Sequence, residues 1–288
     1  IAAMALIGLD VAPPQPPVNR SSPLEEIIAY SLESEAGFNE LGAALTGATP
    51  PAENVTSYTE VINGVDGNDI NLYIHKPTVI DSPIPGIVHT HGGGMVMLQA
   101  SNVGYQRWRD ELAATGLIVI GVEFRNGGGV LGPHPFPAGL NDCASATQWA
   151  IENSESLGIS KVLVSGESGG GNLSIATALK AKEEGWVDGI AGIYSQCPYI
   201  LGHYHDPPEE LLSLVENDNY LLNVGDQMAT ISRLYDPDSS NATNPLAWPY
   251  HADIGDLVGL PPFVLSLIHI SEPTRPERIA YAGFCVKK

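Results

Sequence analysis

Apolar residues recur at helical spacing near the beginning of the chain. A proline-rich stretch, residues 10–23, comes first, and its prolines favour extended backbone and exclude a helix interior there. The apolar positions that follow are Leu24, Ile27, Ile28 and Leu32. Glu25 and Glu26 stand among them, where the dipole of a helix beginning at this point favours acidic residues. The pattern predicts a helix over residues 24–47.

The pattern changes to short β-type runs after this helix. The candidate strands are residues 55–62, 70–75, 84–90, 117–123, 161–165, 189–195 and 263–270. Two of them, 117–123 and 161–165, are rich in consecutive Val, Ile and Leu, which is typical of parallel strands buried on both faces. Helices are predicted over 141–153 and 172–184. The alternation of strands and helices predicts an α/β fold with a mostly parallel central sheet flanked by helices.

A later segment, residues 200–247, breaks this alternation. Its apolar residues Leu211, Leu212, Leu214 and Val215 stand among many Asp and Asn residues. We expect a helical insertion between two strands of the sheet.

The composition describes a folded chain with many turns. The 288 residues are 43% hydrophobic and 16% charged, with 31 Gly and 23 Pro, whereas disorder requires low hydrophobicity together with high charge. With 13 Lys and Arg against 33 Asp and Glu, the net charge of −20 excludes a nucleic-acid scaffold, which needs a basic surface. Cys143, Cys197 and Cys285 are too few and too scattered for a disulfide framework or a zinc site. No metal or organic cofactor is implied.

The apolar run at the beginning, Ile1–Leu9, is too short to be a membrane anchor. A membrane span needs roughly 20 apolar residues. No basic segment precedes the run, as it would in a signal peptide. We therefore expect a cytoplasmic protein without a membrane span.

A serine surrounded by glycines follows the candidate strand 161–165. Residues 166–170 read Gly-Glu-Ser-Gly-Gly and match the G-x-S-x-G pattern, in which Ser occupies a sharp turn between a strand and a helix. The pattern alone arises easily by chance in a glycine-rich chain. Here the strand before it and the predicted helix after it supply the expected context. Ser168 is therefore placed at the carboxyl edge of the sheet, where open α/β sheets carry their sites.

A second glycine cluster, His91–Gly94, follows the candidate strand 84–90. It reads His-Gly-Gly-Gly, a pattern that forms the oxyanion hole of esterases. Consecutive glycines let the backbone pass close to a substrate and turn its N–H groups toward a developing negative charge. No Gly-Lys-Ser/Thr follows either cluster, which argues against a nucleotide-binding loop.

These motifs and several further segments resemble the hormone-sensitive-lipase-like branch of the α/β-hydrolase esterases. The further segments are Val122–Arg125, His134–Asp142, Asn244–Leu246 and Leu260–Pro262. The resemblance runs from about Tyr58 to Pro262 and implies an α/β-hydrolase fold with a helical cap. The implied domains are an N-terminal cap segment at 1–50, a hydrolase core at 51–199, a cap insertion at 200–247 and a core continuation at 248–288.

The resemblance also implies roles for single residues. Ser168 would be the nucleophile of a carboxylic-ester hydrolase and would form an acyl-enzyme. The implied oxyanion hole consists of Gly92, Gly93, Gly94 and Gly169. Gly92 would shape the loop, and the backbone N–H groups of the other three would donate to the oxyanion. His91 is expected to brace the loop, and Glu167 is left open between an acidic position shared with the family and a solvated or locally paired carboxylate.

The catalytic acid and base are harder to place. The family order is Ser, then acid, then His, and Glu272 fits the place of the acid only with one extra residue after Ser266. No histidine follows Glu272, and both His251 and His269 precede it. Glu272 is therefore the candidate acid, and the base is unassigned.

The end of the chain departs abruptly from the family pattern. We hypothesise that the native sequence ends near Ser266 and that residues 267–288 are foreign or frame-shifted. The alternative is divergence, in which Glu272 works and the base is supplied otherwise. Without a base Ser168 is a poor nucleophile, so the activity of this chain is expected to be impaired.

The substrate implied by the resemblance is a small-molecule ester with a short to medium acyl chain, because the family's cap limits the acyl pocket. Two other functions stay open: a non-catalytic small-molecule binder on the same scaffold, and a hydrolase of amides or lactones. No nucleic-acid partner is expected, and the quaternary state is left open, with a homodimer as one arrangement that fits.

Overall fold

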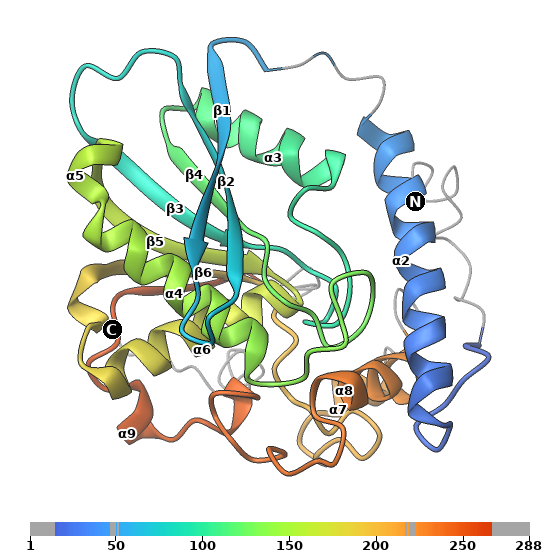
Figure 1. Cartoon of the computed structure of the whole chain (residues 1–288). Helices are drawn as coiled ribbons and strands as arrows, with labels where there is room; N and C mark the ends of the chain where they lie inside the picture. Colours follow the sequence, from blue (N-terminus) through green and yellow to red (C-terminus); the bar gives the residue numbers. More distant parts are fainter. Residues whose placement is uncertain (1–14, 47–49, 51, 217, 219–222, 267–288) are drawn as a thin grey trace.

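One mixed sheet forms the centre of the computed structural model, which describes residues 15–46, 50, 52–216, 218 and 223–266. Within this part of the chain, seven strands lie in the order β1-β2-β4-β3-β5-β6-β7 (Figure 1). The strands are β1 (Val55–Asn63), β2 (Asp69–Pro77), β3 (Ile84–Thr90), β4 (Ile118–Val122), β5 (Ile159–Glu167), β6 (Ile190–Gln196) and β7 (Phe263–Ser266). β2 runs antiparallel to both of its neighbours, and all other neighbouring strands are parallel. The predicted α/β fold with a mostly parallel sheet is confirmed.

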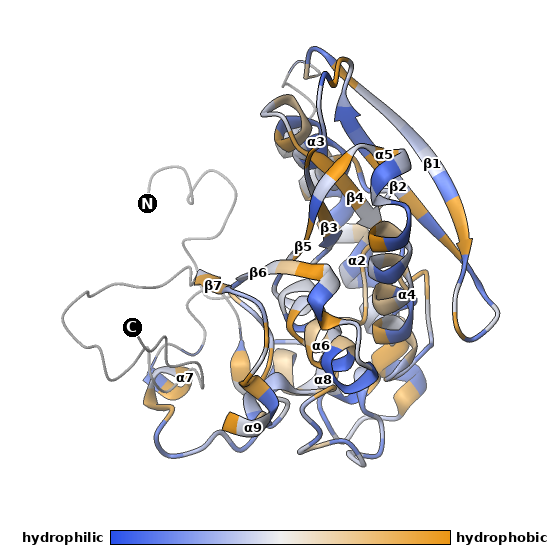
Figure 2. Cartoon of the chain, turned by 90° about the vertical axis from the view of Figure 1, so that its left-hand side faces the viewer, coloured by the Kyte–Doolittle hydropathy of each residue, from blue (hydrophilic) through white to orange (hydrophobic). Residues whose placement is uncertain are grey.

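Burial along the strands follows their place in the sheet. All five residues of β4 are buried, as its continuous apolar sequence predicts for an inner strand. β1 lies at the sheet edge, and Ile62 is its buried residue. Figure 2 shows both hydrophilic and hydrophobic segments along this outer strand.

The helices that pack on strands of the sheet are α3 (Val103–Ala114), α4 (Ala138–Glu152), α5 (Ser154–Leu157) and α6 (Gly169–Glu184). The described residues also form the helices α2 (Leu24–Thr46), α7 (Leu212–Glu216), α8 (Ala229–Tyr235) and α9 (Ile254–Leu257). α4 and α6 pack against each other and against the inner strands. α3 packs on β2 and β4, where Asp110 Oδ1 lies 2.7 Å from His75 Nδ1. Because side chains alternate along a strand, the buried Ile74 beside His75 points to the other face.

The long helix α2 stands beside the sheet and contacts both α3 and α8 (Figure 1). Arg233 Nη1 of α8 donates to the backbone oxygens of Arg20 at 2.8 Å and of Ser22 at 2.6 Å, just before α2 begins. Gln227 Nε2 lies 3.3 Å from the Tyr30 hydroxyl of α2. Two segments about 200 residues apart in the sequence are therefore packed together.

The predicted elements agree with the structure except at α3, at the short helices α5 and α9, which were not predicted either, and in the insertion at 200–247. The helix α3 was not predicted, although its sequence is rich in helix-forming Ala, Leu, Glu, Gln and Arg and Gly116 follows it with a φ of 99°. The insertion at 200–247 was expected to be helical, but its described residues form short helices joined by irregular segments. Pro207-Pro208 and the many Asp and Asn residues explain this, because they favour turns over helix interiors. Residues 267–270 of the last predicted strand lie outside the described residues.

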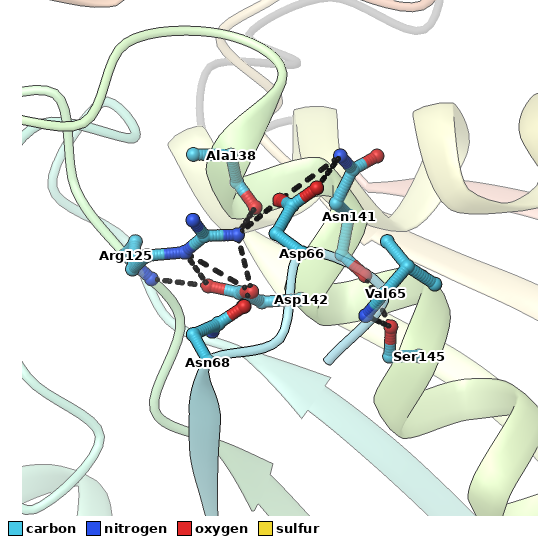
Figure 3. A network of polar contacts seen from close by, with 8 residues as sticks. All are labelled: Val65, Asp66, Asn68, Arg125, Ala138, Asn141, Asp142 and Ser145. Carbon is cyan, nitrogen blue, oxygen red and sulfur yellow. Dashed lines mark hydrogen bonds and ion pairs between the residues drawn. The ribbon is translucent and has the colours of Figure 1, made fainter. Parts of the chain in front are cut away.

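A buried carboxylate fastens the turn between β1 and β2 to the beginning of α4 (Figure 3). The Asp142 side chain is fully buried, and its Oδ2 accepts from Arg125 N at 2.8 Å and from Arg125 Nε at 2.9 Å. Its Oδ1 accepts from Asn68 Nδ2 at 3.0 Å. Arg125 also pairs with Asp66, and this hydrogen bond lowers the pKa of the Asp66 carboxyl. The guanidinium of Arg125 thus connects its own segment with the turn that carries Asp66 and with the helix that carries Asp142.

Replacing Asp142 with Ala should destabilise the fold by about 3 kcal/mol, because it removes several hydrogen bonds to a charged, mostly buried Arg125. Urea unfolding measures the change. The control is Glu111→Ala, which breaks an exposed ion pair with Arg107 and should change the free energy of unfolding by no more than about 0.5 kcal/mol. Equal effects of the two substitutions would contradict the structural role of Asp142.

Candidate active site

Ser168 occupies a strained turn between β5 and α6. Its φ of 53° and ψ of −117° lie in a region that residues with a side chain rarely adopt, and such strain is often found at functional sites. The flanking glycines make the turn possible. A Cβ on Gly166 would lie 2.4 Å from Gly170 O, and a Cβ on Gly170 would lie 1.9 Å from Thr90 O. The backbone at the end of β3 is therefore in direct contact with the backbone of the turn at residues 166–170, called the serine turn below.

The His91–Gly94 loop continues from β3 and runs beside the serine turn. A Cβ on Gly169 would lie 2.6 Å from Gly94 N, so the two loops touch through their backbones. Within the part of the chain that the structure describes, the N–H groups of Gly93 and Gly94 donate to no other atom. Both residues have positive φ, 99° and 64°. These N–H groups and Ser168 thus lie at the same edge of the sheet.

The N–H group of Gly92 is engaged elsewhere. It donates to Glu167 Oε1 at 2.7 Å and to the Tyr105 hydroxyl at 3.1 Å. Gly92 therefore anchors the loop, and Gly93, Gly94 and Gly169 stay the candidate donors.

Glu167 is a paired carboxylate next to the candidate nucleophile. Its Oε2 lies 3.0 Å from His89 Nε2, and its side chain is 27% exposed. Burial by itself would raise the pKa of Glu167, but the electrostatic interaction and hydrogen bond with His89, together with the Gly92 N–H, outweigh this and lower it. Of the two interpretations left open by the sequence, the structure shows the local pairing.

His91 is buried beneath the loop. Its ring stacks on Phe124 with centroids 4.2 Å apart, and its Nδ1 lies 2.8 Å from Gly92 O. Burial lowers its pKa to about 4, so the ring is neutral near neutral pH. These contacts are those of a residue that braces the loop.

No catalytic base contacts Ser168 in the described residues, since its Oγ has no hydrogen-bond partner there. His203 and His251 lie together, with ring centroids 5.6 Å apart, and each has a ring nitrogen beside a backbone oxygen. Glu272, the candidate acid, and His269 lie outside the described residues.

A cleft of about 540 Å³ opens beside the serine turn. Its lining is mostly apolar and includes Phe38 and Leu41 of α2, Tyr105 and Trp108 of α3, and Glu167 and Gln196 at the strand ends. Gln196 O accepts from Ser168 N at 2.9 Å, so the cleft reaches the immediate neighbours of the candidate nucleophile. Its volume falls in the usual range of small-molecule sites, about 300–1,000 Å³.

Sequence reasoning missed two aromatic residues of this site, Tyr105 and Trp108. Both belong to α3, the helix that was not predicted. The Trp108 ring lies 4.2 Å from the His89 ring between centroids, and so supports the partner of Glu167. Burial raises the pKa of Tyr105 well above its ordinary value, which keeps its hydroxyl protonated as a donor.

The described residues hold no group of three or more His, Cys, Asp or Glu side chains arranged to bind a metal ion. No helix among them is long and apolar enough to cross a membrane.

The fold agrees with comparisons with known proteins. A sequence profile for the alpha/beta hydrolase fold matches residues 87–287. The structure of brefeldin A esterase, a bacterial homologue of human hormone sensitive lipase, superposes with a TM-score of 0.87 at 45% identity, covering 92% of this chain and 75% of that one. The chain therefore belongs to the α/β-hydrolase family. Within that family it belongs to the hormone-sensitive-lipase-like branch, as the resemblance predicted.

Curated relatives are more distant. Tuliposide A-converting enzyme 1, chloroplastic, of Tulipa gesneriana is 28% identical over 230 residues, which are 75% of this chain and 54% of the relative. Carboxylesterase NlhH of Mycobacterium tuberculosis is 35% identical over 126 residues, 42% of this chain and 38% of the relative. The chain thus spans about half the length of the curated tulip relative that it matches.

Replacing Glu167 with Gln should reduce the change of the free energy of unfolding with pH in the acidic range. Because the folded-state pKa of Glu167 lies below its ordinary value of 4.5, the carboxylate stabilises the fold above that pH, and this contribution is lost as the pH falls through the lowered pKa. At about pH 7 we expect the variant to be about 1–3 kcal/mol less stable. The difference should shrink below about pH 4.5.

Urea unfolding at a series of pH values measures this difference. The control is Glu183→Gln, an exposed change in α6. A stability gap for Glu167→Gln that stays constant down to about pH 3 would contradict the paired carboxylate.

Proposed function

We propose that this protein is a carboxylic-ester hydrolase that attacks short- to medium-chain acyl esters with Ser168. One observation carries the proposal: the strained Ser168 turn touches the loop of Gly93 and Gly94, whose N–H groups donate to no other described atom. A nucleophile beside free backbone donors is the arrangement that acyl transfer requires.

The reaction proceeds in two halves. A base removes the hydroxyl proton of Ser168, and Oγ attacks the ester carbonyl carbon to form a tetrahedral intermediate. The N–H groups of Gly93, Gly94 and Gly169 hold the negative oxygen; one such donor contributes about 10²–10³-fold to the rate. The alkoxide leaves as the protonated alcohol, and water then attacks the acyl-serine to release the acid and restore the hydroxyl.

We further propose that residues 1–50 and 200–247 form a cap over a core of residues 51–199 and 248–288. The contacts between α2 and α8 join the two cap segments, and α2 lines the cleft with Phe38 and Leu41. An apolar cleft of about 540 Å³ suits a small ester, and its walls limit the length of the acyl group.

The proposed acid is Glu272, on the family resemblance alone. No histidine contacts Ser168 among the described residues. This observation also favours a second candidate function, a non-catalytic binder of small esters on the same scaffold. Amides and lactones would use the same nucleophile, so a substrate panel distinguishes them from esters.

A fluorophosphonate probe should label the chain slowly at Ser168, because the probe forms a covalent bond with an activated serine. Labelling should vanish in Ser168→Ala and persist in Ser160→Ala, an exposed serine of β5. Labelling that survives Ser168→Ala would refute the assigned nucleophile. A folded chain that takes up no probe would instead support the binder.

The turnover of p-nitrophenyl butyrate by the 288-residue chain should lie far below the common enzymatic rate of about 10 per second. Loss of one triad member leaves roughly 10³–10⁴-fold catalysis over water, supplied by binding and the oxyanion hole. Steady-state kinetics with Ser168→Ala as the blank measure the residual rate. An ordinary rate would show that a base reaches Ser168.

A further inference from the structure

A third run of glycines, Gly127–Gly129, lies against the oxyanion loop. We define the oxyanion loop as residues 91–98 and the glycine strap as residues 126–131. The strap pairs with the loop through backbone hydrogen bonds, from Gly127 N to Met95 O and from Gly128 N to Val96 O, both 2.9 Å. The glycines Gly127–Gly129 thus support the loop that carries Gly92–Gly94.

The three glycines of the strap, Gly127–Gly129, leave no room for a side chain. A Cβ on Gly127 would lie 2.6 Å from the backbone oxygen of Leu234 in α8. A Cβ on Gly128 would lie 2.7 Å from Ser31 Oγ of α2. Gly129 has a φ of 60°, and a Cβ there would meet Glu35 Oε2 at 2.4 Å. The strap is therefore enclosed between the oxyanion loop and two helices.

One buried carboxylate of α2 holds both the strap and the loop. Glu35 is 1% exposed; its Oε1 accepts from Leu98 N at 3.0 Å and its Oε2 from Val130 N at 2.7 Å. Ser31, one helical turn earlier, accepts from Gly129 N at 3.0 Å. A buried carboxylate is costly unless it is hydrogen-bonded, and here the two backbone N–H groups are its partners.

The connection from Glu35 to the oxyanion donors is short. The backbone oxygen of Gly93 accepts from Val96 N at 3.0 Å and from Met97 N at 3.1 Å. These hydrogen bonds close the turn that carries Gly93 and Gly94, and Leu98 follows it directly. Asn126 Nδ2 of the strap donates to Leu98 O at 2.7 Å. Leu98 is thus held on both sides, by the strap and by α2.

We propose that Glu35 is a positioning residue for the oxyanion hole, through which the docking of α2 sets the geometry of Gly93 and Gly94. The proposal rests on the proposed hydrolase function. Oxyanion donors must lie within about 2.7–3.1 Å of the developing charge. A displacement of about 1 Å can reduce the rate about 100-fold, so a loosened loop lowers the rate of the chemical step more than it weakens substrate binding.

The test is Glu35→Gln, which keeps the side-chain size but replaces one accepting oxygen with a donating NH₂ group, so only one of Leu98 N and Val130 N can keep its acceptor. We expect kcat for p-nitrophenyl butyrate to fall about 10–100-fold, with KM changed by no more than about threefold. Hydrogen exchange of the peptides that contain residues 91–98 and 126–131 should accelerate. Glu33→Gln, an exposed change in the same helix, is the control and should alter neither quantity.

A second variant, Ser31→Ala, covers the case in which Glu35→Gln does not fold. It removes only the acceptor of Gly129 N. We expect a smaller fall in kcat and a smaller acceleration of hydrogen exchange than in Glu35→Gln.

The outcomes separate the two proposals. Faster exchange together with a lower kcat supports the positioning role, and faster exchange with unchanged kcat overturns it. If hydrogen exchange is unchanged in a folded variant, Glu35 does not hold the oxyanion loop and the strap, and the proposal is overturned. If the unmodified chain shows no turnover that depends on Ser168, the hydrolase proposal fails, and the positioning role fails with it whatever the exchange shows.

Discussion

The close approach of the ends of β3 and β5 is the constraint on which the site depends. A Cβ on Gly166 or Gly170 would clash with Thr90 O. The loops that follow β3 and β5 can therefore lie in contact only with glycine at these two positions. Between these glycines Ser168 has a positive φ of 53°, and Gly94 lies against Gly169. Nucleophile and oxyanion donors are thus placed by backbone contacts rather than by flexible side chains.

Two carboxylates then fix the ends of the oxyanion loop. Glu167 holds Gly92 from β5, and Glu35 holds Leu98 from α2, each by accepting a backbone N–H. The buried Glu35 carboxylate would be strongly unfavourable without partners, so its contacts specify one loop conformation. The oxyanion loop is therefore secured at both ends by carboxylates from different parts of the chain.

The features that the sequence predicted are local ones. The parallel strands follow from continuous apolar runs, and the Ser168 turn and the His91–Gly94 loop follow from motifs a few residues long next to those runs. The pairing of Glu167 with His89 joins residues 78 positions apart, and that of Glu35 with Val130 joins residues 95 apart. No periodicity encodes such contacts, because they form only after the strands and α2 are assembled.

The most direct test of Ser168 as the nucleophile is to trap its acyl-enzyme. The chain is mixed with p-nitrophenyl butyrate, quenched in acid and digested, and the peptides are analysed by mass spectrometry. The account predicts one butyryl group, located on Ser168 and absent from Ser168→Ala. A butyryl group on another residue, such as Cys197 beside the turn, or release of butyrate without any Ser168 adduct, would contradict it.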